Sequence, residues 1–158
     1  MALVVVGMAD LQIAKAPDIL TTLGLGSCIG VTLFDQARKI GGLAHIMLPY
    51  SAAFSGQNRA KFADTALEDI INLLVRSGAQ RTALVAKMAG GAHMFGGSTS
   101  NILKVGERNA VACKEVLAKM RIPVLASETG GQHGRTIELD ITNGSLKIRT
   151  IGHGEKFI

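Results

Sequence analysis

Short runs of β-branched and aliphatic residues, each bounded by glycine, proline or polar residues, predict the β-strands of this chain. The runs cover residues 3–9, 20–23, 29–35, 40–48, 82–89, 124–127, 135–141 and 146–151. Pro49 closes the fourth run, because its nitrogen cannot donate to a strand ladder. Asn143 and Gly144 separate the last two runs, and their tolerance of positive φ predicts a tight hairpin there.

Two segments carry the three- and four-residue spacing of an amphipathic helix. In the first, residues 61–77, one helical face collects Phe62, Ala63, Ala66, Leu67, Ile70, Ile71 and Leu74, and Gly78 can end the helix. The second runs from about residue 107 to residue 120. Residues 49–58 and the glycine-rich stretch 90–100 are predicted as loops, the latter mobile. Since no repeat, low-complexity tract or linker divides the chain, we expect one domain over residues 1–158.

The composition is that of a folded globular protein. Of the 158 residues, 47% are hydrophobic and 18% charged, which excludes a disordered chain, and the 19 glycines lack the period of collagen. The longest charge-free stretches are interrupted by Gly, Thr, Ser, Pro and His, whereas a membrane-spanning helix needs about 20 mostly apolar residues. Residues 1–8 lack a basic leading segment and a cleavage site, so we expect no signal peptide, no membrane insertion and a cytoplasmic location.

The net charge of +5 is dispersed, with no block of like charge. A mild basic excess of this kind suits an acidic protein surface as well as a nucleic acid. The chain has no Trp, one Tyr and five Phe, so it lacks most of the aromatic platforms on which single-stranded nucleic acid stacks. We therefore expect a solvated surface of mixed charge and no nucleic-acid partner.

The two cysteines occupy different kinds of position. In a reducing compartment, each is either a buried small hydrophobe or a reactive thiol. Cys113 falls on the apolar stripe of the second helix with Val116 and Leu117, so we expect it to be packed and inert. Cys28 follows the small-residue stretch 24–27, where the backbone can turn sharply and let a substrate approach, so it is a candidate nucleophile.

A thiol with an ordinary pKa of about 8.5 needs a neighbouring imidazole or oriented backbone dipoles to act as a nucleophile at neutral pH. Four histidines are available: His45, His93, His133 and His153. His45 lies inside the apolar run 42–48, where a rigid strand would hold it. Both a core histidine and a catalytic base fit this position, and composition leaves the two open.

Three other motifs fail on inspection. Gly24 and Gly26 start like a dinucleotide fingerprint, but Ile29 stands where the fingerprint needs glycine or alanine, and a strand pattern follows instead of a helix. The phosphate-binding pattern G-x-x-x-x-G-K-[S/T] is absent, and the glycine pairs at 90–91 and 96–97 lack its lysine. The histidines and cysteines show no C-x-x-C or H-x-x-x-H spacing, so we expect no metal site.

Several segments, taken in order, carry a family resemblance. They are TLGLGSC at 22–28, AHIMLP at 44–49, KFAD at 61–64, AGGAHMF at 89–95, VGERN at 105–109, ETGG at 128–131, and GRT at 134–136 followed by NG at 143–144 and KIR at 147–149. Together they resemble the CheD family, the chemoreceptor glutamine deamidases of bacterial and archaeal chemotaxis, over nearly the whole chain. His93 departs from the pattern, because the family usually has a small polar residue after Gly-Gly-Ala.

The resemblance implies an α/β fold in which mixed β-sheets stack as a sandwich with flanking helices, similar to the cysteine-hydrolase fold of cytotoxic necrotizing factor toxins. It also implies a catalytic set of Cys28, His45 and Thr22, in which His45 takes the thiol proton and holds the thiolate as an ion pair while Thr22 orients the imidazole. Backbone N–H groups around Ser27 and Cys28 would hold the oxyanion, with Ser27 supporting the loop or this hole. No metal or organic cofactor is required.

The activity that the resemblance implies is that of a protein-glutamine glutaminase, which turns receptor glutamine into glutamate and ammonia. The implied protein partners are chemoreceptor cytoplasmic domains and the phosphatase CheC. A binding module that docks to both without turnover is an alternative, and a cysteine protease or a receptor methylesterase is another. Retention of Cys28, His45 and Thr22 favours the enzyme, because an adaptor has no chemical need for all three.

Overall fold

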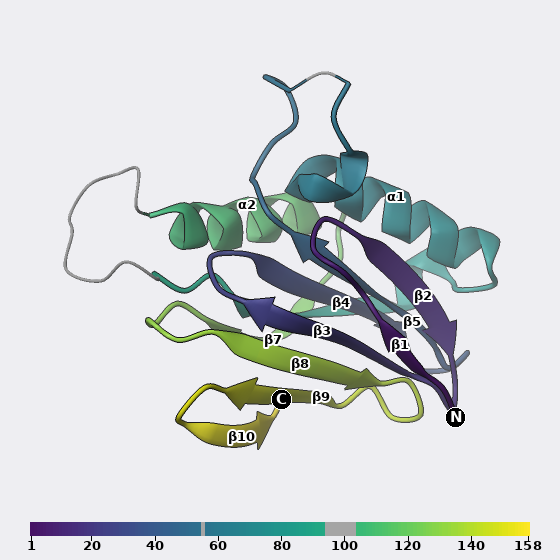
Figure 1. The fold of residues 1–158 in the computed structure, drawn as a ribbon. Coiled ribbons are helices and arrows are strands. Elements are labelled where there is room, and N and C mark those ends of the chain that lie inside the picture. The colour runs from purple at the N-terminus through teal and green to yellow at the C-terminus, as the bar shows by residue number, and fades with distance from the viewer. Residues whose placement is uncertain (55, 94–103) are drawn as a thin grey trace.

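The computed structural model describes residues 1–54, 56–93 and 104–158, which form two stacked five-stranded sheets and two α-helices (Figure 1). The β3 sheet contains, in spatial order, β1 (Leu3–Val5), β3 (Ile19–Leu25), β8 (Arg135–Asp140), β9 (Leu146–Thr150) and β10 (Gly154–Phe157). The β4 sheet contains β2 (Leu11–Lys15), β5 (Ile40–Ile46), β4 (Ile29–Asp35), β6 (Leu84–Gly90) and β7 (Val124–Thr129). The helices are α1 (Ala63–Arg76) and α2 (Val105–Lys119), and 3₁₀ turns span Arg59–Lys61 and Arg81–Ala83.

Each sheet is mixed, with one parallel pair among antiparallel ones: β1 with β3, and β6 with β7. This confirms the expected α/β fold with stacked mixed sheets. Both helices lie on the outer side of the β4 sheet (Figure 1), where they share a hydrophobic core with its strands. Within the described ranges no helix covers the outer face of the β3 sheet, so the helices flank the sandwich on one side.

Strands β4 and β5 are buried along their whole length, because both of their faces are covered. One set of alternating side chains, including Val31 and Leu33, packs under the helices. The other set, including Phe34 and Leu43, faces the β3 sheet. This second layer, between the two sheets, contains the candidate nucleophile Cys28.

Both predicted helices are confirmed, with ends within two residues of the predicted bounds. Every predicted strand is present, although β1 stops at Val5, and β6 begins at Leu84 because the three preceding residues form a 3₁₀ turn. Strands β2 and β10 were not predicted. Both are edge strands, and the four residues of β10 are all exposed, so neither carries the continuous apolar run that reveals a buried strand.

The hairpin between β8 and β9 is confirmed, but its turn is longer than predicted. Residues 141–145 connect the strands, and of the two predicted turn residues only Gly144 has a positive φ, of 77°. Of the predicted mobile loop, Gly90 ends β6, while residues 94–100 lie outside the described residues. None of the described helices combines the length and the apolar composition needed to cross a membrane.

Candidate active site

Cys28 lies at the turn that links β3 to β4. The register of β3 against β8 shifts between Thr22 and Leu25, and residues 26–28 then bend into β4. Cys28 is 8% exposed and packs in the core between the two sheets. Irregularities of this kind in a strand often redirect side chains beside functional sites. The thiol is therefore held in a packed layer.

His45 lies on the same face of the β4 sheet as Cys28. It pairs with Gly30 of the neighbouring strand, and Cys28 stands two positions before Gly30. Side chains alternate between the two faces of a strand, so the paired positions His45 and Gly30 share one face, and Cys28, which directly precedes β4, packs in the core on that side. That face is the one between the sheets, since a Cβ on Gly30 would lie 2.6 Å from Cδ1 of Ile137 in β8.

Thr22 reaches His45 across this layer from the β3 sheet. Its Oγ1 lies 2.7 Å from Nδ1 of His45 and 2.7 Å from the carbonyl oxygen of Val6. The carbonyl can only accept, so the single hydroxyl hydrogen of Thr22 goes to Val6. Nδ1 of His45 then donates its own hydrogen to Thr22 Oγ1, which leaves Nε2 as the basic nitrogen. Thr22 and Val6 together select the tautomer that can take a proton at Nε2.

Burial sets the proton affinities of His45 and Cys28. His45 is 1% exposed, and its Nε2 has no hydrogen-bond partner among the residues that the structure describes. Burial lowers the pKa of His45 and raises the pKa of the Cys28 thiol, because the apolar layer disfavours both charged forms. Burial therefore favours the neutral form of both groups. The ion pair of thiolate and imidazolium expected from the family resemblance stays a prediction.

Three successive carbonyl groups hold the turn around the thiol in place. The carbonyl of Gly26 accepts from Ala92 N at 2.8 Å, and the carbonyl of Cys28 accepts from Gly91 N at 2.9 Å. Between them, the carbonyl of Ser27 accepts from Nδ2 of Asn109 at 2.9 Å. Ser27, predicted to support the loop or the oxyanion hole, thus anchors the turn through its backbone.

The sequence pattern did not point to Asn109, although one signal was present. Asn109 stands four residues before Cys113, on the buried face of α2. A polar side chain on a buried helical face must find hydrogen-bond partners inside the protein. That requirement marks Asn109 as a residue with a specific internal role.

Cys113 is confirmed as a core residue. It is fully buried in the hydrophobic core under α2, and burial raises the pKa of its thiol to about 12. A thiol with such a pKa is almost entirely protonated at neutral pH.

The other histidines lie elsewhere. His93 donates its backbone N–H to Gly131 at 2.8 Å, and its Nε2 is buried with no partner in the described part of the chain. His133 and His153 are exposed and pack against each other, with ring centroids 4.2 Å apart. Of the four histidines, only His45 is hydrogen-bonded to Thr22. Within residues 1–54, 56–93 and 104–158, no cluster of three or more metal-binding side chains occurs.

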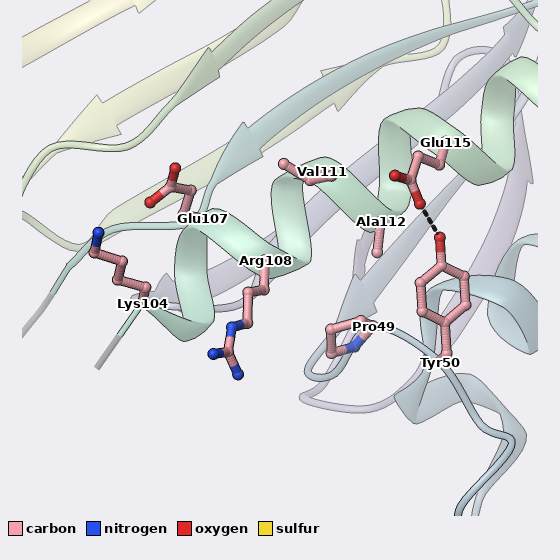
Figure 2. Close-up of a pocket in the computed structure, with 8 residues that line it drawn as sticks. All are labelled: Pro49, Tyr50, Lys104, Glu107, Arg108, Val111, Ala112 and Glu115. Atoms are coloured by element: carbon pink, nitrogen blue, oxygen red, sulfur yellow. Dashed lines mark hydrogen bonds between the residues drawn. The ribbon is translucent and has the colours of Figure 1, made fainter. Parts of the chain in front are cut away.

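Figure 2 shows a pocket of about 470 Å³ beside α2 and the segment that follows β5. It is lined by Pro49, Tyr50, Lys104, Glu107, Arg108, Val111, Ala112 and Glu115. The Tyr50 hydroxyl donates to the Glu115 carboxylate, and mainly this bond raises the pKa of Tyr50 to about 12. Neither Cys28 nor His45 lines the pocket, so it does not mark the reacting groups.

Comparison with known proteins shows which family this chain resembles. Residues 47–150 match the family model described as CheD chemotactic sensory transduction. The chain is 52% identical over 155 residues to the probable chemoreceptor glutamine deamidase CheD of Caldanaerobacter subterraneus subsp. tengcongensis, covering 97% of this chain and 96% of that protein. It is 46% identical over 156 residues to the chemoreceptor glutamine deamidase CheD of Bacillus subtilis, covering 97% of this chain and 94% of that protein.

Among solved structures, a Neisseria meningitidis protein of the DUF152 family aligns with a TM-score of 0.51 and 9% identity. The alignment covers 82% of this chain and 64% of that one, so this chain spans less than two thirds of that structure. At this identity the likeness shows a shared fold alone.

Proposed function

This chain belongs to the CheD family, and we propose that it is a protein-glutamine glutaminase that converts glutamine side chains of chemoreceptors to glutamate with release of ammonia. The observation that carries the proposal is the hydrogen bond between Thr22 and His45, because it leaves a basic Nε2 on the same face of the sheet as the Cys28 thiol. The substrate is supported by the name of the Bacillus subtilis relative, a chemoreceptor glutamine deamidase.

In the first half of the reaction, Nε2 of His45 takes the thiol proton while Sγ of Cys28 attacks the side-chain amide carbon of the glutamine. Burial disfavours both the thiolate and the imidazolium, so the proposed proton transfer accompanies the attack. A carbon–sulfur bond forms, and the carbonyl electron pair moves to the oxygen. The oxyanion then collapses, the carbon–nitrogen bond breaks, and the proton on His45 passes to the nitrogen, which leaves as ammonia.

In the second half, water hydrolyses the thioester. Nε2 of His45 takes a proton from the water, whose oxygen attacks the thioester carbon. The tetrahedral intermediate expels the sulfur of Cys28, which recovers the proton from His45. One water is consumed and a glutamate side chain remains. These steps involve no metal or organic cofactor.

Backbone N–H groups of Ser27 and Cys28 are proposed to stabilise the oxyanion. In a planar trans peptide, the N–H of one residue points opposite to the carbonyl of the residue before it. The carbonyls of Gly26 and Ser27 are directed to Ala92 and Asn109, so these two N–H groups point away from those partners. In the described residues neither N–H group donates to another protein group. Two such donors suit a developing negative charge.

We further propose that the protein acts in the cytoplasm, on chemoreceptor cytoplasmic domains, and that CheC is a second protein partner, as the family resemblance implies. The competing interpretation is a binding module that docks to the same partners without turnover. A cysteine protease would cleave the receptor backbone, and a methylesterase would release methanol. The three activities differ in product and can therefore be separated in one assay.

The test is incubation of a chemoreceptor cytoplasmic fragment with the wild-type protein, Cys28→Ala, and Cys113→Ala as the matched thiol control. Deamidation adds about 1 Da to a glutamine-containing peptide and releases one ammonia, both of which mass spectrometry and an ammonia assay detect. We expect wild type and Cys113→Ala to be active and Cys28→Ala to be inactive. Binding without any mass change by the wild-type protein would support the binding module, and equal activity of Cys28→Ala would refute the thiol mechanism.

A further inference from the structure

We propose that Asn109 is a positioning residue for the reaction, which holds the peptide between Ser27 and Cys28 so that the Cys28 N–H faces the oxyanion. This inference rests on the proposed function. Asn109 belongs to α2 and is fully buried. Asn109 is remote in sequence from Cys28, yet its side chain is hydrogen-bonded to Ser27, the residue directly before Cys28.

The amide of Asn109 joins the two segments that carry the reacting groups. Its Nδ2 lies 2.9 Å from the carbonyl oxygen of Ser27 and 2.9 Å from the carbonyl oxygen of Met47. The first precedes Cys28 and the second follows His45 by two residues. An asparagine amide has two hydrogens, and both are used here. One side chain therefore ties the turn of the nucleophile to the end of the strand that carries the base.

The bond to Ser27 determines where the next N–H points. The carbonyl of Ser27 and the N–H of Cys28 belong to one rigid peptide plane and point in opposite directions. With the carbonyl held by Asn109, rotation of this plane is blocked and the N–H of Cys28 is directed away from α2. The neighbouring carbonyls of Gly26 and Cys28 accept from backbone N–H groups. Of these three carbonyls, that of Ser27 accepts from a side chain, the amide of Asn109.

Helix α2 is itself seated firmly against this turn. A Cβ on Gly106 would lie 2.5 Å from the carbonyl oxygen of Gly91 and 2.6 Å from that of Ala92. Only glycine permits this approach of two backbones. The N–H groups of Gly91 and Ala92 donate to the turn that carries Cys28. The N-terminal end of α2 and this turn therefore pack together through Gly91 and Ala92. Asn109 lies three residues after Gly106 and thus faces the same side of the helix.

The two ends of the Asn109 amide differ, because its donors are used and its oxygen is not. Oδ1 is buried and, across the described ranges, has no hydrogen-bond partner. The side chain is thus placed for its two donors, to the carbonyls of Ser27 and Met47, at the expense of its own acceptor. Departures from good packing chemistry are expected where function requires a particular group.

The test compares Asn109→Leu, which keeps the branching at Cγ and removes both donors, with Asn109→Ser, which is too short to bridge the two carbonyls. Thr32→Val is the control, because it removes one partly buried hydrogen bond elsewhere on β4, from Thr32 Oγ1 to the carbonyl oxygen of Lys87 at 3.2 Å. Steady-state deamidation of a chemoreceptor cytoplasmic fragment and the rate of Cys28 alkylation by iodoacetamide are measured for each. Alkylation displaces iodide and forms no oxyanion, so its rate measures the reactivity of the Cys28 thiol independently of the oxyanion hole.

We expect kcat to fall by about 100-fold in both Asn109 variants, the loss that a displacement of about 1 Å causes in a preorganised site, with KM within about threefold of wild type. Alkylation of Cys28 should stay within about threefold, and Thr32→Val should keep wild-type kcat. An unchanged kcat overturns the inference. So does a parallel loss of alkylation and kcat, which shows a general structural role, or a rise in KM alone. The failure of the proposed function looks different, because Cys28→Ala would then match wild type.

Discussion

Replacing Thr22 by valine removes one hydroxyl and keeps nearly the same shape, and it acts on two buried groups at once. Nδ1 of His45 and the carbonyl oxygen of Val6 each lose a partner at 2.7 Å. Thr22 is fully buried, so water cannot replace the hydroxyl. Without the acceptor at Nδ1, His45 is free to carry its hydrogen on Nε2, and that tautomer cannot take the thiol proton.

The magnitude follows from the two orphaned groups. Each buried donor or acceptor without a partner costs about 1–3 kcal/mol, and the additional buried methyl group returns about 1 kcal/mol. We therefore expect Thr22→Val to lose about 3 kcal/mol of unfolding free energy, which for a domain of this size lowers the Tm by roughly 6–12 °C. The kcat for deamidation should fall by about 100-fold or more, because His45 then carries its hydrogen on Nε2 and cannot act as the general base there.

Thr22→Ser is the matched control, because it retains the hydroxyl and loses only a methyl group. We expect it to keep kcat within a few-fold of wild type and to lose about 1 kcal/mol of stability. Thermal unfolding and ammonia release from a chemoreceptor fragment measure both quantities. Equal kcat in the valine and serine variants would refute the assignment of the tautomer to Thr22.

Four further outcomes follow from the site. Iodoacetamide should label Cys28 well before Cys113 in the native protein, because the second thiol is sealed in the core with a pKa near 12, and preferential labelling of Cys113 would contradict the choice of nucleophile. His45→Ala should fold and lose deamidation, and activity within a few-fold of wild type would require another base, such as His93. Burial puts the pKa of folded His45 below its unfolded value of 6.5, so the unfolded chain binds more protons at low pH. The free energy of unfolding should therefore fall as the pH drops below about 6.5. An equally steep fall in His45→Gln would exclude His45 as the cause. With a dispersed charge of +5, binding to a receptor fragment should weaken only modestly with salt, whereas tight, steeply salt-dependent binding to duplex DNA would contradict the chemotaxis assignment.

The features that local pattern determines were predictable from the sequence. The spacing of apolar residues in 61–77 and 107–120 located both helices, and it placed Cys113 in the core. Strands covered on both faces, such as β4, were visible as apolar runs. Strands β2 and β10 were not, because edge strands with exposed residues lack that pattern. The family resemblance, carried by motifs along the chain, selected Cys28, His45 and Thr22 as the candidate set.

The geometry of the site was decided by the packing of one sheet on the other. Thr22 and His45 belong to different sheets, so their hydrogen bond exists only because the sheets stack in this register. Val6, which sets the direction of the Thr22 hydroxyl, directly follows β1, and Asn109, which holds the Ser27 carbonyl, belongs to α2. The lowered pKa of His45 and the raised pKa of Cys28 depend on the depth of their burial. Local periodicity reports which face of a strand or helix is buried, but the partners across a buried layer are chosen by tertiary packing.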